Sequence, residues 1–327
     1  MKTESTANIY RLKNLGLPPL ATIEDIANAT RLSPEYIKYL AFRTNFLYKT
    51  FTIPKRSGGN RKIANPSRAL KGIQGWILRN ILDKLSSSEF SMGFEKGTSI
   101  LDNALPHTGS TFILTIDLED FFPSITGEKI FGVFNSIGYS RSISHILANL
   151  CLFEGRLPQG APTSPKLANL VCSRLDSRIN GYTGPKGIVY TRYADDITLS
   201  SQSLNKLYKA YNFIPFILQD EGFSLNPNKT IFSGTRKKKS VTSLIISGDT
   251  VGIGREKYRE IRSKFHKEFT GITTNKEHLH GWISFINSVD RKSSIKLKNY
   301  IACLIEKYPD SEASKNFLKI TEKNKTQ

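Results

Sequence analysis

Cysteine is scarce in this 327-residue sequence, which contains only three. Cys151, Cys172 and Cys303 lie far apart and are set among apolar residues. This spacing argues against a disulfide framework and against a zinc site, because both need cysteines in pairs or close clusters. We therefore expect three reduced cysteines in the core.

Long apolar runs are also absent. No stretch approaches the roughly 18 apolar residues that a membrane-spanning helix needs. The first residues, MKTESTANIYRLKN, lack the apolar core of a signal peptide. These absences predict a soluble, cytoplasmic protein with no membrane partner.

Acidic residues are few compared with basic ones. The chain has 28 Asp and Glu against 47 Lys and Arg, which gives a formal net charge of +19 at pH 7. An excess of this size favours a polyanionic partner, above all nucleic acid. Added solubility, or attraction to membrane phospholipid, would account for the same charge. The length allows a core that is spread over two or three subdomains.

The first third of the chain is predicted to hold helices around one hairpin. Capping signals at Thr22 and Ser33 start two short helices. Residues 49–64 alternate around a Ser-Gly-Gly-Asn turn, which predicts a β-hairpin. Apolar residues at helical spacing predict a long helix over 70–85. The basic residues on or beside the hairpin tip, which could hold a triphosphate, are Lys55, Arg56, Arg61 and Lys62.

Strands and helices interleave in the middle third, which predicts an α+β fold. Residues 111–117 have the pattern of a buried strand, and residues 187–201 that of two strands joined at Ala-Asp-Asp. Between them, Ser164 and Pro165 start a helix whose apolar positions extend to Ile179.

The last third is predicted to be a basic helical region. After the charged segment 235–240, a short strand pair precedes three helical patterns, and the last dozen residues are expected to be disordered. A solvated helix face and a face that follows a nucleic-acid backbone would both carry the charges of the first helix. Its basic residues are Arg255, Lys257, Arg259, Arg262, Lys264 and Lys267.

Three aspartates form the most informative pattern. Asp195 and Asp196 stand at the turn between two predicted strands, and Asp117 ends another. Neighbouring carboxylates repel one another unless a cation lies between them, so this arrangement predicts a magnesium site. Two Mg²⁺ ions about 3.5–4 Å apart can activate an attacking 3′-hydroxyl and stabilise a leaving pyrophosphate. An Asp-Asp pair by itself can equally cap a turn.

Three further features would complete a nucleotide site. An aromatic ring at Phe121 or Phe122 could lie under the incoming sugar and exclude a 2′-hydroxyl, although either ring could also belong to the core. The loop 157–162 precedes a helix amino terminus, where Gly lets the backbone approach a base pair and the helix dipole favours phosphate. Lys229 could give a proton or a charge to the departing pyrophosphate, or lie on a solvated surface.

Four segments in this order resemble the palm motifs of reverse transcriptases: IDLEDFFPSI, LPQGAPTSPKLAN, YTRYADDITLS and LNPNKT. The segment from Asn103 to His107 resembles the Asn-Ala-x-x-His signature of bacterial retron reverse transcriptases. The resemblance implies a right-hand polymerase fold with a palm sheet, fingers and a helical thumb. It implies a helical extension at 1–45, fingers and palm at 46–237, and a basic, RNA-binding thumb at 238–327.

The resemblance also implies a role for individual residues. The implied ligands of two Mg²⁺ ions are Asp117, Asp195 and Asp196, the catalytic residues, together with the carbonyl of Leu118. The implied nucleotide-binding residues are Lys55, Arg61, Phe122 as the steric gate, Gln159, Gly160 and Lys229. The implied RNA-binding residues are Asn103, His107, Val241, Thr242, Arg255, Lys257 and Arg262. Ser243 stands where the family has Gly, and it lacks the freedom of Gly at positive φ.

Retron enzymes that this chain resembles copy a cognate structured non-coding RNA, called msr-msd, from deoxynucleotides. They prime from the 2′-hydroxyl of an internal guanosine and make branched msDNA, and by the same resemblance the complex acts in phage defence with an accessory effector protein. The carboxylates after residue 230 show no metal-binding pattern. We therefore expect no built-in RNase H domain and removal of the template by a host RNase H.

Two alternatives remain at this point. One is a reverse transcriptase of another lineage, such as a group II intron or diversity-generating type, and the segment from Asn103 to His107 argues against it. The other is a non-enzymatic RNA-binding scaffold, for instance an antitoxin, with a vestigial site. Three intact aspartates argue against the scaffold.

Overall fold

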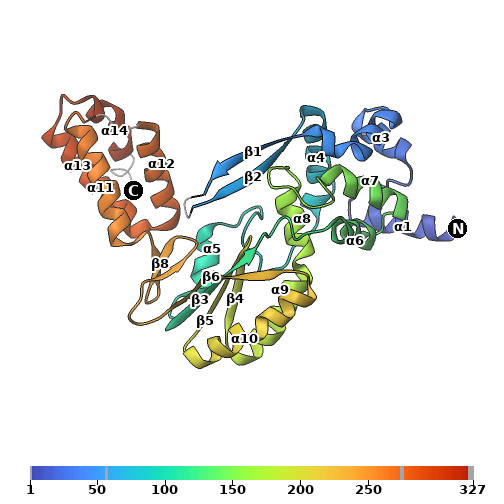
Figure 1. The fold of residues 1–327 in the computed structure, drawn as a ribbon. Coiled ribbons are helices and arrows are strands. Elements are labelled where there is room, and N and C mark those ends of the chain that lie inside the picture. The colour runs from blue at the N-terminus through green and yellow to red at the C-terminus, as the bar shows by residue number, and fades with distance from the viewer. Residues whose placement is uncertain (1, 56–57, 273–275, 323–327) are drawn as a thin grey trace. The chain divides into compact units, whose positions relative to one another are not determined.

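The computed structural model describes residues 2–55, 58–272 and 276–322, so Arg56 of the predicted hairpin tip lies outside the described residues (Figure 1). The chain forms two compact units. The N-terminal unit comprises Met1–Thr98 and Leu114–Ile231, and the C-terminal unit comprises Ser99–Ile113 and Phe232–Gln327. The predicted fingers and palm at 46–237 and thumb at 238–327 remain functional predictions, and the structure adds residues 99–113 to the C-terminal unit.

The first elements of the N-terminal unit confirm the local signals of the sequence. Thr22 and Asp25 form a reciprocal capping box, and the Ser33 side chain accepts a hydrogen bond from the Tyr36 N–H. The hairpin pairs antiparallel from Tyr48 opposite Pro66 to Pro54 opposite Asn60. The elements are α1 (Lys2–Asn14), α2 (Ile23–Thr30), α3 (Pro34–Phe42), β1 (Tyr48–Pro54), β2 (Asn60–Pro66) and α4 (Arg68–Asn80). Helix α4 ends earlier than predicted, and a 3₁₀ turn over Leu82–Lys84 follows it.

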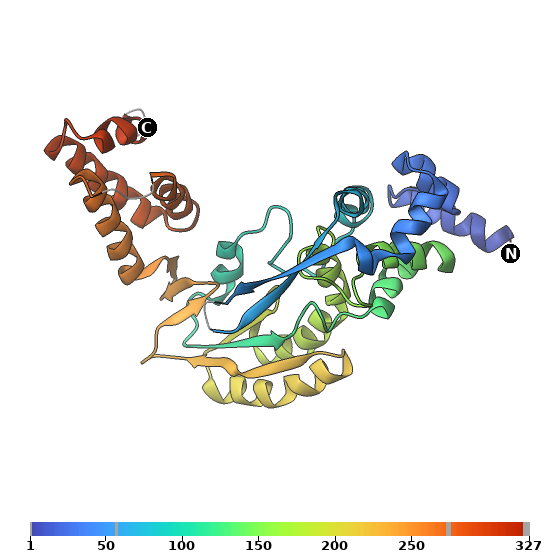
Figure 2. The same cartoon turned by 45° about the horizontal axis from the view of Figure 1, so that its top comes forward.

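A four-stranded sheet with the order β4-β5-β3-β6 lies at the centre of this unit. Its strands are β3 (Phe112–Glu119), β4 (Val189–Tyr193), β5 (Asp196–Ser201) and β6 (Ser224–Ser233). The further helices of this unit are α6 (Gly127–Ile137), α7 (Arg141–Cys151), α8 (Ser164–Val171), α9 (Ser173–Thr183) and α10 (Leu204–Asp220). Helices α9 and α10 pack together and against β4 and β5, so they cover one face of the sheet (Figure 2).

The single helix predicted from Ser164 to Ile179 is in fact two helices. They meet at Cys172, where ψ is −2° and the regular helix is interrupted for one residue. Cys172 is fully buried, as are Leu167 and Ile179 on either side. The apolar spacing continues across so short an interruption, which is why the sequence pattern did not reveal it.

The C-terminal unit combines a small sheet with a helical core. Its elements are α5 (Ile100–Ala104), β7 (Lys239–Val241), β8 (Leu244–Ser247), β9 (Thr250–Gly252), α11 (Gly254–Phe269), α12 (Lys276–Val289), α13 (Arg291–Lys307) and α14 (Glu312–Glu322). The predicted strand pair is a three-stranded sheet. The expected disorder of the last dozen residues is wrong up to residue 322, because α14 buries Phe317 against Phe265 and Phe269.

Residues 99–113 are held in this unit by side-chain and backbone hydrogen bonds. The Thr242 hydroxyl donates to the Ile100 carbonyl at 3.2 Å, the Gly109 N–H donates to the Gly248 carbonyl at 2.9 Å, and the Lys239 ammonium donates to the Ser110 carbonyl at 2.6 Å. The segment therefore belongs to the core that the β7–β9 sheet covers.

Two of the three cysteines match the prediction. Cys151 and Cys172 are free and buried, but Cys303 is exposed. Helix α13 buries Ile301 and Leu304 in the core. Cys303 lies between them in the sequence but points outward. Within the described ranges, no helix is both long and apolar enough to cross a membrane.

The β7–β8 turn carries backbone strain at Ser243, the position where the resemblance implies glycine. Thr242 and Ser243 have φ of 45° and 68°, and Val241 pairs with Leu244 across them. A two-residue hairpin turn of this kind favours Gly or Asn, because the left-handed backbone conformation costs free energy in most residues that carry a Cβ.

Replacing Ser243 with Gly should therefore raise the free energy of unfolding by roughly 0.5–1 kcal/mol, after allowance for the greater freedom of Gly in the unfolded chain. Urea denaturation measures the change. Ser243→Ala is the matched control, because it keeps Cβ and the strain. A Gly variant no more stable than the Ala variant would contradict the prediction.

Candidate active site

The sheet brings the three predicted aspartates together. Strand β3 lies beside β5, and the Leu118 N–H donates to the Asp195 carbonyl at 2.9 Å. Tyr193 pairs with Asp196 across the β4–β5 turn, and Ala194 in that turn has a φ of 58°. Asp117 therefore lies next to the turn that presents Asp195 and Asp196, as the sequence predicted.

Lys229 binds Asp117 directly. From the neighbouring strand β6, its ammonium lies 2.9 Å from each carboxylate oxygen of Asp117. This hydrogen bond raises the pKa of Lys229, so the side chain stays cationic. The structure thus brings Lys229 into the site, while its predicted role at the pyrophosphate stays a prediction.

Mutual repulsion and partial desolvation act on the two aspartates of the turn. Desolvation, followed by the charge of Asp117, raises the pKa of Asp195. Desolvation is the largest of the causes that raise the pKa of Asp196 to about 6, and the charges of Asp195 and Asp117 add to it. The residue as a whole is nevertheless exposed. The charge of Lys229 opposes both shifts.

The donor chemistry fits a hard divalent cation. The charge of Asp117 raises the pKa of both aspartates of the turn, and a cation that prefers oxygen ligands would relieve this repulsion. In the part of the chain that the structure describes, however, no group of three or more His, Cys, Asp or Glu side chains is arranged as a metal site. Lys229 engages both oxygens of Asp117 instead. The assignment of these aspartates as metal ligands is therefore a proposal.

The aromatic pair that follows Asp117 divides into two environments. Phe121 is buried and stacks on Phe223 with ring centroids 6.0 Å apart. Phe122 is only partly buried, and its ring lies 6.3 Å from that of Phe94. Phe121 is therefore the core residue, and Phe122 is the ring of the pair that remains partly accessible.

The loop with Gln159 and Gly160 packs on the hairpin. The Ala64 N–H donates to the Gln159 carbonyl at 2.9 Å. Gly160 has a φ of 132°, and a Cβ there would lie 2.6 Å from the Ala64 carbonyl oxygen. The close approach that requires glycine is thus to strand β2 of the hairpin. A role for this loop in binding nucleotide remains a prediction.

The described basic residues of the hairpin differ in what they contact. Lys55 and Arg61 are exposed, and the charge of Arg61 opposes the rise in the pKa of Asp195. Lys62 instead pairs with Glu154 at 3.2 Å and lies over the ring of Phe153. Of the described basic residues of the hairpin, Arg61 is therefore the one with an electrostatic effect on Asp195.

A buried polar network behind the turn was missed by the sequence reasoning. Arg192 and Asp176 are fully buried and form an ion pair of 2.7 Å, and Asn169 is buried beside them. The available signal was a charged residue inside each of two apolar patterns: Arg192 in the strand before the turn, and Asp176 on the helix with the apolar stripe. Buried charges of this kind need partners, and such sites are often functional.

The predicted RNA-binding residues are distributed between the core and the surface of the C-terminal unit. Asn103, His107 and Val241 are buried, and Thr242 is partly buried. Burial lowers the pKa of His107 to about 4, so it is neutral at physiological pH. In this arrangement, Asn103 and His107 could influence RNA only through the scaffold, and their role stays a prediction.

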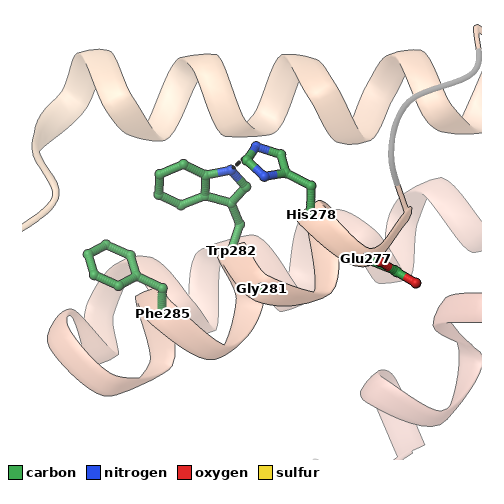
Figure 3. A pocket seen from close by; sticks show the side chains of 5 residues that line it. All are labelled: Glu277, His278, Gly281, Trp282 and Phe285. Atoms are coloured by element: carbon green, nitrogen blue, oxygen red, sulfur yellow. Dashed lines mark hydrogen bonds between the residues drawn. The ribbon is translucent and has the colours of Figure 1, made fainter. Parts of the chain in front are cut away.

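The surface residues of this unit combine positive charge with aromatic rings. Arg255 is exposed, Lys257 lies 4.6 Å from the centre of the Trp282 ring, and Arg262 lies 4.2 Å from that of Tyr300. A hollow of about 440 Å³ on α12 is lined by Glu277, His278, Gly281, Trp282 and Phe285 (Figure 3). Trp282 is partly exposed.

Comparison with known proteins identifies a family. A family model described as reverse transcriptase (RNA-dependent DNA polymerase) matches residues 53–247. The retron Ec86 reverse transcriptase of Escherichia coli is 53% identical over 317 residues, covering 96% of this chain and 99% of that protein. The retron Mx65 reverse transcriptase of Myxococcus xanthus is 33% identical over 312 residues, covering 88% of this chain and 73% of that protein.

Among solved structures, a telomerase from Candida albicans in complex with a TWJ fragment of telomeric RNA aligns with a TM-score of 0.47 and 12% identity. The alignment covers 84% of this chain and 63% of that one. A similarity at this level carries no argument about function.

In the metal-free protein, the carboxyl group of Asp196 should titrate at a pH of about 6. Because its pKa is raised on folding, the charged form destabilises the folded protein above this pH, and the effect disappears as the pH falls. Mg²⁺ should shift the midpoint downward, and Mg²⁺ affinity should fall as Asp196 is protonated. Carbon-detected NMR of labelled aspartate follows both changes.

Asp195→Asn provides the control for this titration, since it removes a neighbouring charge that raises the pKa of Asp196. The midpoint should fall in this variant. A midpoint that responds neither to Asp195→Asn nor to Mg²⁺ would show that the carboxylates do not interact as described.

Proposed function

The chain belongs to the retron reverse transcriptases, a family of RNA-directed DNA polymerases with a right-hand fold, and we propose that it copies one cognate structured RNA into branched DNA. Family membership decides against a group II intron or diversity-generating lineage. The template is RNA, and we propose that it is the msr-msd RNA encoded beside the gene. In this proposal, synthesis starts from the 2′-hydroxyl of an internal guanosine and yields msDNA.

The observation that carries the proposal is the convergence of Asp117, Asp195 and Asp196 at one end of the β4-β5-β3-β6 sheet. Reverse transcriptases use divalent metal ions, and here the three carboxylates with the Leu118 carbonyl would hold two Mg²⁺. Such ions supply activation of the attacking hydroxyl and charge stabilisation of the leaving pyrophosphate. The protein positions these ligands on adjacent strands, whose backbone hydrogen bonds fix their spacing.

The remaining residues of the site bind and select the nucleotide in this proposal. Phe122, which follows Asp117 in the chain and is partly accessible, would exclude a 2′-hydroxyl by contact with the sugar. Gln159 and Gly160 form the loop that packs on the hairpin, and that hairpin carries Lys55 and Arg61 toward the triphosphate. Lys229, which stays cationic, would neutralise charge on the pyrophosphate as it leaves.

We also propose that the basic and aromatic surface of α11, α12 and α13 binds the RNA. Lys257 and Arg262 supply positive charge, and their positions over Trp282 and Tyr300 leave ring faces beside cations. Backbone phosphates and unpaired bases need this combination of charge and stacking surface. The finished complex would act in phage defence with an accessory effector protein, and a host RNase H would remove the copied template.

Asp195→Asn should lower primer extension on an RNA template by more than about a hundredfold, since loss of a metal ligand should cost at least as much as loss of an outer-shell partner. RNA affinity and folding should be retained. Asp220→Asn is a matched control on an exposed carboxyl that pairs with Arg178 at 2.7 Å, and it should extend normally. Near-normal extension by Asp195→Asn would show that the reaction does not require Asp195.

Co-expression with the DNA upstream of the gene tests the retron reaction itself. We expect a short DNA on a denaturing gel that requires Asp195 and changes in size after treatment with debranching enzyme and with RNase. Extension of ordinary primers without this product would retain the polymerase and overturn the proposed self-priming on a cognate RNA.

Trp282→Ala should weaken binding of the cognate RNA about tenfold, because stacking of a base on an aromatic ring contributes about 1–3 kcal/mol. The dependence of affinity on salt should stay the same in this variant. Lys257→Gln should instead reduce the salt slope by about one charge. Phe216→Ala, at an exposed ring on α10, is the control. An unchanged affinity of Trp282→Ala for the cognate RNA would show that the RNA does not bind at this ring.

A further inference from the structure

Arg192 forms a buried, two-point ion pair directly behind the aspartate turn. It lies on β4, three residues before Asp195, and its side chain is fully buried. Its Nε donates to Asp176 Oδ1 at 2.7 Å and its Nη2 donates to Asp176 Oδ2 at 2.8 Å. Two parallel hydrogen bonds between planar groups fix the orientation of the guanidinium as well as its position.

The third guanidinium nitrogen reaches the turn itself. Arg192 Nη1 donates to the Ala194 carbonyl at 3.0 Å and to Asn169 Oδ1 at 3.2 Å. The Ala194 carbonyl belongs to the peptide plane that carries the N–H of Asp195. A fixed guanidinium therefore fixes this plane, and with it the direction in which the chain enters the two aspartates.

The other side of the turn is closed by Gly93. Residues before it pair with β4, since the Arg192 N–H donates to the Phe90 carbonyl and the Met92 N–H to the Arg192 carbonyl, both at 2.8 Å. A Cβ on Gly93 would lie only 2.7 Å from the Ala194 nitrogen. The turn is thus held between a hydrogen bond on its carbonyl and a backbone packed against its nitrogen.

Asn169 links the two sides. Its amide nitrogen donates to the Gly93 carbonyl at 2.7 Å and to Glu95 Oε1 at 2.8 Å, and Glu95 also pairs with Lys166 at 2.6 Å. The same amide accepts from Arg192 through its oxygen. Helix α8, the segment around Gly93 and the turn are therefore joined by one polar network.

We propose that Arg192 is a positioning residue that holds the Ala194–Asp195 peptide, and hence both aspartates, in the orientation that binds the divalent cation. The proposal rests on the proposed role of Asp195 and Asp196 as metal ligands. A buried ion pair is weak evidence of stability, because its desolvation offsets much of its attraction. The ion pair does fix the direction in which the guanidinium points. Residues that hold metal ligands in place commonly tune the affinity for the metal in this way.

Gly93→Ala tests the proposal without removing any charge. The added methyl group must displace the turn by pressing on the Ala194 nitrogen. We expect the Mn²⁺ dissociation constant of the full-length protein, measured by electron paramagnetic resonance without substrate, to rise about tenfold. The kcat for extension should fall about 10–100-fold with little change in KM for primer-template, and excess Mn²⁺ should restore part of the activity.

Gly181→Ala is the matched control. It adds the same methyl group on α9, where a Cβ would meet nothing within 4 Å, so Mn²⁺ affinity and kcat should match those of the unaltered protein. Arg192→Lys is the second variant. One ammonium keeps a charge beside Asp176 but cannot supply the two-point pair and the bond to the Ala194 carbonyl together. It should show the same loss of Mn²⁺ affinity as Gly93→Ala.

Wild-type Mn²⁺ affinity in both Gly93→Ala and Arg192→Lys would overturn the proposal, even if their thermal stability fell, because a structural role alone would produce that result. Asp195→Asn separates this failure from failure of the proposed function. If Asp195→Asn leaves Mn²⁺ affinity unchanged, the metal site itself is wrong. If it removes binding while the two network variants do not, only the positioning role is wrong.

Discussion

Repulsion among Asp117, Asp195 and Asp196 is the constraint on which the rest of the site depends. Charged groups do not gather in a partly desolvated place unless cations and backbone hold them there. In this chain, Lys229 contacts Asp117 directly, and the charge of Arg61 on the hairpin opposes the rise in the pKa of Asp195. Desolvation, together with the smaller effect of the charges of Asp195 and Asp117, nevertheless raises the pKa of Asp196, although the charge of Lys229 opposes the shift. A divalent cation would offset this repulsion.

Backbone contacts explain how the site withstands this repulsion. The bond from the Leu118 N–H to the Asp195 carbonyl joins the two aspartate-bearing segments, and Arg192 holds the turn from behind. Gly160 lets the loop before α8 pack on strand β2, so the hairpin and the loop form one surface. Small residues at two points of close backbone approach, Gly93 and Gly160, thus matter as much for the geometry as the charged side chains.

The predicted RNA-binding residues of the C-terminal unit lie partly in its core and partly on its surface. The segment with Asn103 and His107 is part of the core, whereas Lys257 and Trp282 form a basic aromatic surface. Because Asn103 and His107 are buried, this segment shapes the fold beneath the surface that we propose to bind RNA. The strained Ser243 in the turn of the same unit indicates that this scaffold tolerates a cost of roughly a kilocalorie per mole.

The sequence by itself determined the features that depend on neighbours along the chain. The capping box at Thr22, the hairpin and the turn before Asp196 follow from residues a few positions apart, and the order of the motifs identified the family. Only the tertiary structure decided that Arg192 pairs with Asp176, that Cys303 is exposed and that α14 completes a core. Spacing reports periodicity within one element, whereas pairing and burial depend on which elements the folded core brings together.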